Sequence, residues 1–171
     1  NLMPDRSNEP HYLLNSLRER AKELNCLYMV DEILMAAMPI GHKLQEVARV
    51  MPQGWYSPQN CEASIVYMGK QYNSEGYSEG GPVLSEKVIV NGNIVGRISV
   101  SYPQKAPELE KGGYFLNEEK RLIRTVARRI AHTILHDSLS HMFEEDGSEL
   151  TDTQSEKESW RTILDMLLIT D

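Results

Sequence analysis

The dipeptide Asn91-Gly92 lies between two apolar runs, residues 88–90 and 94–95. Asn-Gly in this position is the signature of a type I′ β-hairpin, because both residues tolerate the positive φ that this turn requires. We therefore predict two antiparallel strands joined at Asn91-Gly92. The two-residue loop also fixes the register of that strand pair.

The register predicts three facing pairs: Ile89 with Ile94, Val88 with Val95, and Glu86 with Arg97. Facing residues share one side of a sheet, so we expect Glu86 and Arg97 to form an ion pair on the outer side. The core side is expected to consist of Ile89, Ile94, Ile98, Val100 and Tyr102.

A second hairpin is expected earlier in the chain. Over residues 61–67 the apolar side chains alternate with a period of two, which is typical of a half-buried strand. Gly69-Lys70 offers a tight turn, and the return strand begins over residues 71–73. Glycines and a proline then indicate a loop over residues 74–82.

Three helices are expected around these strands. The first spans about residues 12–38 without Pro or Gly, and Pro39 ends it. Its apolar stripe recurs at steps of three and four residues and consists of Leu13, Leu17, Ala21, Leu24, Leu27, Tyr28 and Leu34. A short helix is predicted over 44–51, and a long one over 118–143 with Asn117 as its N-cap. This order predicts an α+β fold in which two long helices flank one antiparallel sheet.

Composition divides the chain into four parts. Residues 1–11 are interpreted as a flexible arm, and residues 12–143 as the domain. Residues 144–158 are rich in Glu and Asp and are expected to form an acidic linker. Residues 159–171 predict the start of a further helix, on the apolar spacing of Trp160, Ile163, Leu164, Leu167 and Leu168. Because the chain begins at Asn1 and stops directly after this apolar run, we expect it to be a fragment.

The charge balance and the cysteine count disfavour several classes of function. Lys and Arg number 18 against 25 Asp and Glu, a formal net charge of −7, whereas nucleic-acid-binding proteins usually carry a basic surplus. No apolar run approaches the roughly 20 residues of a membrane span, and no signal-peptide pattern begins the chain. Cys26 and Cys61 are too few for a disulfide scaffold and form no zinc spacing. We expect a cytoplasmic protein with reduced thiols and without a nucleic-acid, membrane or metal partner.

Three segments carry a resemblance to a known family: 18–28 (RERAKELNCLY), 52–58 (PQGWYSP) and 63–67 (ASIVY). They resemble GAF domains, small-molecule-sensing modules related to the PAS fold, and the resemblance spans about residues 17–136. The chain departs from the pattern at Met68, since relatives usually carry an acidic residue before the turn glycine. Residues 160–171 resemble the linker that joins such a domain to enzymes of the phosphoenolpyruvate-synthase type. The resemblance implies a non-catalytic sensory or regulatory domain, with an effector domain downstream in the same longer chain.

The resemblance also implies a ligand pocket between one sheet face and its covering loops. The candidate ligand-binding residues are Trp55, Tyr56, Tyr67, Tyr72 and Tyr102. Aromatic walls with a few polar tips suit a small organic ligand, whose identity the sequence does not predict. Alternatively, these aromatic side chains complete the core and the domain has no pocket.

A homodimer is the expected means of signalling. The first and last long helices are expected to lie together on the sheet face opposite the pocket. Their apolar residues Leu17, Leu24, Ile130 and Ile134 would then pair with a second copy as a four-helix bundle. A ligand would act by binding one arrangement of the helices better than another. The first alternative is a dimerisation module of a larger enzyme that has lost its ligand.

The second alternative is histidine phosphotransfer. Residues 129–140 resemble the phosphoacceptor helix of one histidine-kinase class, and an imidazole such as His136 beside a carboxylate can accept a phosphoryl group. His132 and His136 also share a helix face at a spacing that suits metal ligands, but no third ligand is evident. The cluster of Lys120, Arg121, Arg124, Arg128 and Arg129 is interpreted as a solvated helix face rather than an anion site.

Overall fold

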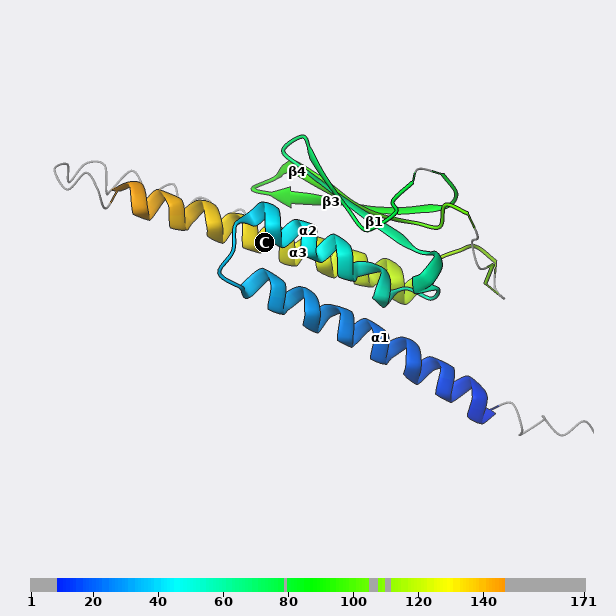
Figure 1. Ribbon diagram of the computed structural model, residues 1–171. Coiled ribbons are helices and arrows are strands. Elements are labelled where there is room, and N and C mark those ends of the chain that lie inside the picture. Colours follow the sequence, from blue (N-terminus) through cyan, green and yellow to red (C-terminus); the bar gives the residue numbers. More distant parts are fainter. Residues whose placement is uncertain (1–8, 79, 105–107, 110–111, 147–171) are drawn as a thin grey trace, which may run out of the picture.

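The computed structural model describes residues 9–78, 80–104, 108–109 and 112–146 (Figure 1). In chain order its elements are helices α1 (Glu9–Met35) and α2 (Ile40–Val50), 3₁₀ helices η1 (Met51–Gly54) and η2 (Pro58–Asn60), strands β1 (Glu62–Tyr67), β2 (Lys70–Asn73), β3 (Val83–Val90) and β4 (Asn93–Ser101), and helix α3 (Asn117–Asp146). The predicted α+β class is confirmed for these residues.

The strands form one antiparallel sheet in the order β2-β1-β4-β3. Helix α2 packs on β1 and β2, and α3 packs on β3 and β4, so together they cover one face of the sheet. Helix α1 contacts α2, α3 and η1 and forms a third layer beyond them (Figure 1). The expectation that both long helices lie on the sheet is therefore wrong for α1.

Gly54 marks the point where η1 passes between α1 and α3. A Cβ atom at this position would lie 2.8 Å from a methyl carbon of Leu122 on α3 and 2.9 Å from Cβ of Cys26 on α1. Side-chain carbons do not approach this closely. A residue without a side chain therefore allows α1 to pack over η1 and α3.

The hairpin of β3 and β4 has the predicted turn but not the predicted register. Asn91 and Gly92 have φ of 53° and 74°, as a type I′ turn requires, and Ile89 faces Ile94. At the next step Val88 faces Gly96 instead of Val95, so Val95 is the extra residue of a β-bulge. A Cβ atom on Gly96 would lie 2.3 Å from the carbonyl oxygen of Val66, so β1 approaches β4 closely at this point.

The bulge overturns the predicted ion pair. Beyond it Arg97 faces Lys87, and Glu86 faces Ile98. Glu86 and Arg97 therefore lie on opposite sides of the sheet and do not pair.

The bulge also changes which residues face the core. Ile98, Val100 and Tyr102 are buried as predicted, but Ile89 and Ile94 are exposed on the face away from α2 and α3, which we call the outer face. An inserted residue moves every side chain on one side of it to the opposite face. The prediction that Ile89 and Ile94 belong to the core is therefore wrong.

The hairpin of β1 and β2 turns at Met68-Gly69 rather than at the predicted Gly69-Lys70, because Tyr67 faces Lys70. Met68 has φ of 52° and its side chain is exposed. A methionine in the left-handed region is strained, whereas asparagine adopts it readily.

We expect Met68→Asn to raise the free energy of unfolding by about 0.5–1 kcal/mol, because it removes the strain of a methionine at positive φ. Urea unfolding followed by circular dichroism measures the change. Met68→Val is the matched control and is expected to destabilise the domain, since a β-branched residue tolerates positive φ least. A Met68→Asn protein less stable than the wild type would contradict this account of the turn.

The helix boundaries differ from the predicted ones at both ends of the domain. Helix α1 begins at Glu9, because Pro10 fits the first turn of a helix, where its missing N–H has no partner to lose. It ends at Met35, and Lys43 Nζ donates to the carbonyl oxygen of Leu34 at 2.9 Å. Helix α3 continues to Asp146, so the first residues of the predicted acidic linker are helical. The rest of that linker, the helix predicted from Trp160 and the first eight residues of the predicted arm lie outside the described residues.

Candidate functional site

Helix α1 carries two apolar stripes on different sides. The inner stripe, Cys26, Val30 and Leu34, is buried against the rest of the domain. The other stripe faces solvent, and Leu17, Leu24 and Tyr28 are exposed to 64%, 67% and 63%. We call this second stripe the outer stripe; it consists of Leu14, Leu17, Ala21, Leu24, Tyr28 and Met35, all exposed.

The spacing of the outer stripe is that of a coiled coil. From Leu14 to Tyr28 its members follow one another at alternating steps of three and four residues, the a/d pattern of a heptad repeat. Soluble proteins seldom leave a continuous apolar stripe of this length without a partner. The outer stripe is therefore a candidate interaction surface.

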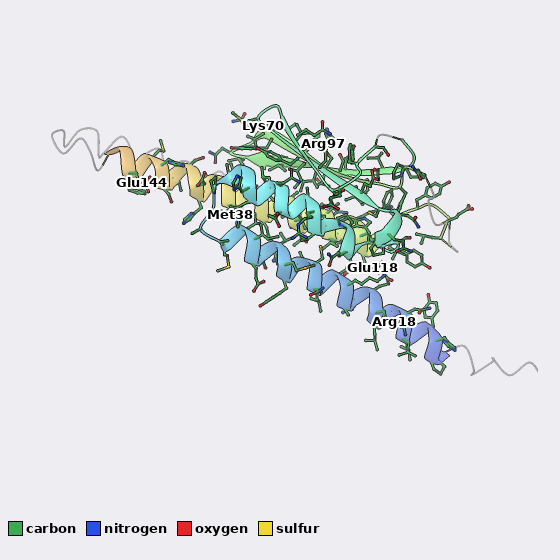
Figure 2. The ribbon with its side chains drawn as sticks, viewed as in Figure 1. Arg18, Met38, Lys70, Arg97, Glu118 and Glu144 are labelled. Atoms are coloured by element: carbon green, nitrogen blue, oxygen red, sulfur yellow. The ribbon has the colours of Figure 1, made fainter. Side chains whose placement is uncertain are left out.

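The two long helices project from opposite ends of the domain. The first half of α1, which includes Arg18, diverges from the rest of the domain at one end, and the last turns of α3, which include Glu144, extend beyond the sheet at the other (Figure 2). Every described side chain from Pro10 to Arg18 is exposed. The outer stripe therefore begins on a part of α1 that the domain itself does not cover.

The structure separates the four predicted interface residues into two groups. Leu17 and Leu24 belong to the outer stripe and are exposed. Ile130 and Ile134 are buried in the core, with exposed fractions of 1% and 5%. Their assignment to a dimer interface is wrong, because α3 uses this side to cover the sheet and cannot present it to a second chain.

Polar side chains hold α1 beside α3. Arg129 of α3 forms an ion pair with Asp31 of α1. Nearer the start of α3, a cleft of about 260 Å³ lies between the helices and is lined by Arg20, Glu23, Leu24, Leu27, Glu118, Arg121, Leu122 and Thr125. Burial, reinforced by the nearby Glu118, raises the pKa of Glu23. The contact between α1 and α3 is therefore more polar than the inner stripe, and the Arg129–Asp31 ion pair contributes to it.

A buried carboxylate, Glu119, lies at the start of α3. Its side chain is 1% exposed. Oε1 accepts a hydrogen bond from the N–H of Leu116 and Oε2 accepts one from the N–H of Tyr56, both at 2.7 Å. Burial raises the pKa of Glu119 to about 7, although both hydrogen bonds favour the ionised form. Glu119 therefore joins α3 to the segment between η1 and η2 and titrates near neutral pH.

The peptide group of Tyr56 is bound from both sides. Its N–H donates to Glu119 of α3, and its carbonyl oxygen accepts from Lys22 Nζ of α1 at 3.2 Å. Lys22 Nζ also lies 5.9 Å from the centroid of the Tyr56 ring, within range of a cation–π interaction. One exposed residue thus connects the two long helices.

Sequence reasoning missed Glu119 as a site residue. A glutamate three residues after an N-cap is the capping-box pattern, but the usual N-cap residue of that pattern is Ser or Thr. Here the carbonyl oxygen of Leu116 accepts the first helical hydrogen bond, from Lys120, so Leu116 is the N-cap and the predicted Asn117 is the first helical residue. The contact with Tyr56 depends on the tertiary fold and has no signal in the sequence.

The five predicted ligand-binding aromatics lie at two ends of the domain. Trp55 and Tyr102 are fully buried near the last residues of β4, where Tyr102 Oη accepts a hydrogen bond from the N–H of Ser57 at 3.4 Å and the Tyr102 ring stacks on Phe115 with centroids 5.5 Å apart. Tyr56 lies at the same end and is exposed.

The other two aromatics lie at the end where the hairpins turn. Tyr67 and Tyr72 are half-buried and pack against the core. Their side chains and that of Tyr102 lie on the helix-covered side of the sheet, because they share faces with Ile65 and Ile98. The structure therefore does not gather the five residues around one pocket, and it places Trp55 and Tyr102 in the core.

A cleft elsewhere is lined by polar and charged residues. It has a volume of about 350 Å³ and lies between the 3₁₀ segments and the ends of β1 and β2. Its lining consists of Arg49, Pro52, Gln53, Pro58, Gln59, Cys61, Glu62, Ser74 and Glu75. None of the five predicted aromatics is among these residues or among those of the cleft between α1 and α3.

The remaining candidate groups are the two cysteines, the histidine pair of α3 and its basic face. Cys26 and Cys61 are buried, and burial raises the pKa of Cys26 to about 12 and that of Cys61 further, so both remain protonated at neutral pH. His132 and His136 are exposed on α3. Of the predicted basic face, Lys120, Arg121, Arg124 and Arg128 are exposed, while Arg129 is paired with Asp31. Within the described ranges no group of three or more His, Cys, Asp or Glu is placed to hold a metal ion.

A search of protein-family models, of curated proteins and of solved structures finds no match to this chain. In the part of the chain that the structure describes, none of the helices combines the length and the apolar character that crossing a membrane requires.

Proposed function

We propose that this chain is a non-catalytic regulatory module, of a GAF-like kind, that pairs with a second copy of itself through the outer stripe of α1. The observation that carries the proposal is the exposure of six residues at heptad spacing along one side of a helix whose other side is already buried. An apolar stripe with this period fits best against a second helix with the same period.

The apolar area of the stripe is of the size that a pair of helices needs. Burying one large apolar side chain contributes about 1.5–3 kcal/mol. In a two-fold pair each residue is buried twice, so Leu14, Leu17, Leu24 and Tyr28 alone supply eight buried side chains. Because each of these side chains is already partly buried in the single chain, their sum is about 7–15 kcal/mol, comparable to the roughly 4–15 kcal/mol that association costs in lost freedom of motion.

The proposed signalling path runs from α1 to α3. Pairing fixes α1, and α1 acts on α3 through the inner stripe, through Arg129 with Asp31, and through the Tyr56 peptide held between Lys22 and Glu119. Helix α3 leaves the domain at the end opposite to the start of α1 (Figure 1). A change in how α1 pairs would thus alter the helix that leads toward an effector domain in a longer chain.

Binding of a small molecule is a second candidate function, and the cleft of about 350 Å³ favours it. Its size lies in the range of small-ligand sites. Because Arg49, Glu62 and Glu75 line it, the cleft suits a polar or zwitterionic molecule rather than the flat organic ligand that an aromatic wall would favour.

Native mass spectrometry of the protein purified from its own host tests both roles in one spectrum. We expect the mass of two chains. A reproducible additional small-molecule mass on the dimer would support sensing, and its loss in Arg49→Ala would assign it to the polar cleft. A dimer without additional mass would count against a resident ligand, and a spectrum of single chains would contradict the proposed pairing.

A further inference from the structure

The outer face of the sheet carries an apolar and basic patch at the end where both hairpins turn. Its apolar members Val66, Met68, Ile89 and Ile94 are exposed to 38%, 75%, 51% and 60%. Ile89 faces Ile94, and the N–H of Met68 donates to the carbonyl oxygen of Val95 at 3.3 Å, which places the β1–β2 turn beside the β3–β4 hairpin. We call the set of Val66, Met68, Ile89, Ile94, Lys87 and Arg97 the hairpin-end patch.

Lys87 and Arg97 give this patch an unbalanced positive charge. Both are exposed, and they face each other directly across β3 and β4. Figure 2 shows Arg97 on the side of the sheet away from the helices. Like charges directly opposite each other destabilise a strand pair. Of the ion pairs formed among the described residues, none involves either cation, so a bound anionic group would relieve the repulsion.

The chain carries a segment of complementary chemistry immediately after α3. Residues 147–171 contain six acidic residues and two basic ones. The segment ends in apolar residues at helical spacing, which are Trp160, Ile163, Leu164, Leu167 and Leu168. Acidic side chains followed by an apolar stripe match a surface on which two cations adjoin four exposed apolar residues.

The position of α3 brings this segment within reach of the patch. The last turns of α3 project from the same end of the domain at which the hairpins turn (Figure 1). Residues 147–159 can span up to about 45 Å when extended. Helix α3 continues from its buried residue Ile134 to Asp146, which takes its end only about 18 Å further along the helix axis. The connection is therefore long enough to return to the outer face of the sheet.

We infer that residues 147–171 dock on the hairpin-end patch of their own chain, with acidic groups at Lys87 and Arg97 and the apolar stripe over Ile89 and Ile94. This contact goes beyond the proposed pairing and does not depend on it, because the outer stripe of α1 lies on the far side of the molecule. Docking would hold residues 147–171 against the domain. Release would leave these residues free to contact an effector domain that follows them in a longer chain.

Disulfide trapping in the full chain tests the inference. Ile94→Cys with Leu164→Cys is the test pair. Asn93→Cys with Leu164→Cys is the matched control, because Asn93 is exposed at the same end of the sheet but faces Val90, on the opposite face from Ile94. The native thiols are buried and do not compete. Under mild oxidation we expect the test pair to form an intramolecular disulfide at least about tenfold faster than the control, because docking raises the effective concentration of the two thiols.

Two further outcomes sharpen the test. Adding Lys87→Glu and Arg97→Glu to the test pair is expected to slow the disulfide about fivefold or more, because repulsion replaces attraction at these exposed positions. Equal rates for the test and control pairs, or an unchanged rate after charge reversal, would overturn the inference. Disulfides that join two chains instead of closing within one would assign the patch to a second copy and would also overturn it.

Discussion

The double substitution Leu17→Glu with Leu24→Glu is expected to convert the paired chain into a monomer. Both side chains are exposed in the single chain and lie at the centre of the outer stripe. In the pair, each substitution removes two buried leucines, worth about 1.5–3 kcal/mol each, and places charges against an apolar surface. We expect the dissociation constant to rise at least about a hundredfold, since 1.4 kcal/mol corresponds to a factor of ten. Sedimentation velocity measures it.

Two controls separate loss of pairing from loss of fold. The circular dichroism spectrum of the double variant should match that of the wild type, because neither leucine contributes to the core of its own chain. Val83→Glu, at an exposed apolar residue on the sheet, should leave the dissociation constant unchanged. If the Leu17→Glu and Leu24→Glu protein pairs as tightly as the wild type, the outer stripe is not the interface.

The second large effect concerns Glu119 and the pH dependence of stability. The pKa of Glu119 rises from 4.5 to about 7 in the folded chain, chiefly because the carboxyl is buried. The folded state thus holds a proton more tightly than the unfolded state. Its contribution to stability is full below pH 4.5 and is lost as the pH rises through 7. We expect the free energy of unfolding to fall by about 2 kcal/mol between pH 5.5 and pH 8, as measured by urea unfolding at one protein concentration.

Two variants at position 119 identify the source of this effect. Glu119→Gln keeps the size of the side chain and one acceptor oxygen but cannot titrate, so it should remove the decline in stability between pH 5.5 and pH 8. Glu119→Ala should destabilise the chain by about 2–4 kcal/mol, because it leaves the N–H groups of Tyr56 and Leu116 without their acceptor. An undiminished pH dependence in Glu119→Gln would show that another group titrates.

The elements that local chemistry determines were predictable. Asn-Gly strongly favours a type I′ turn because both residues accept positive φ, and the structure has this turn at Asn91-Gly92. The three helices were predictable from apolar residues spaced three or four positions apart and from the prolines that end two of them. The bulge at Val95 was not predictable, because it reflects the close approach of β1 at Gly96, a contact between residues some thirty positions apart in the sequence. That single insertion accounts for the wrong Glu86–Arg97 pair and for the exposure of Ile89 and Ile94.

The candidate site was predictable only in part. Periodicity identified Leu17, Ala21, Leu24 and Tyr28 of the outer stripe but joined them to Leu34, which is buried in the inner stripe, because it does not distinguish a stripe that meets the core from one that meets solvent. For the same reason Ile130 and Ile134 were placed at an interface although α3 buries them. The sequence does not indicate whether the aromatic side chains face the core or a pocket, since Trp55 and Tyr102 suit either. The junction at Glu119 arises only when the Tyr56 segment meets the start of α3.

The central claim is that the outer stripe of α1 pairs two copies of this chain. Sedimentation equilibrium of the full chain, from about 1 to 100 μM, tests it most directly, because micromolar pairing corresponds to about 8 kcal/mol of association free energy. Pairing through the outer stripe predicts a mass of twice the 19.5 kDa of one chain above about 10 μM. A mass of 19.5 kDa throughout this range would contradict it.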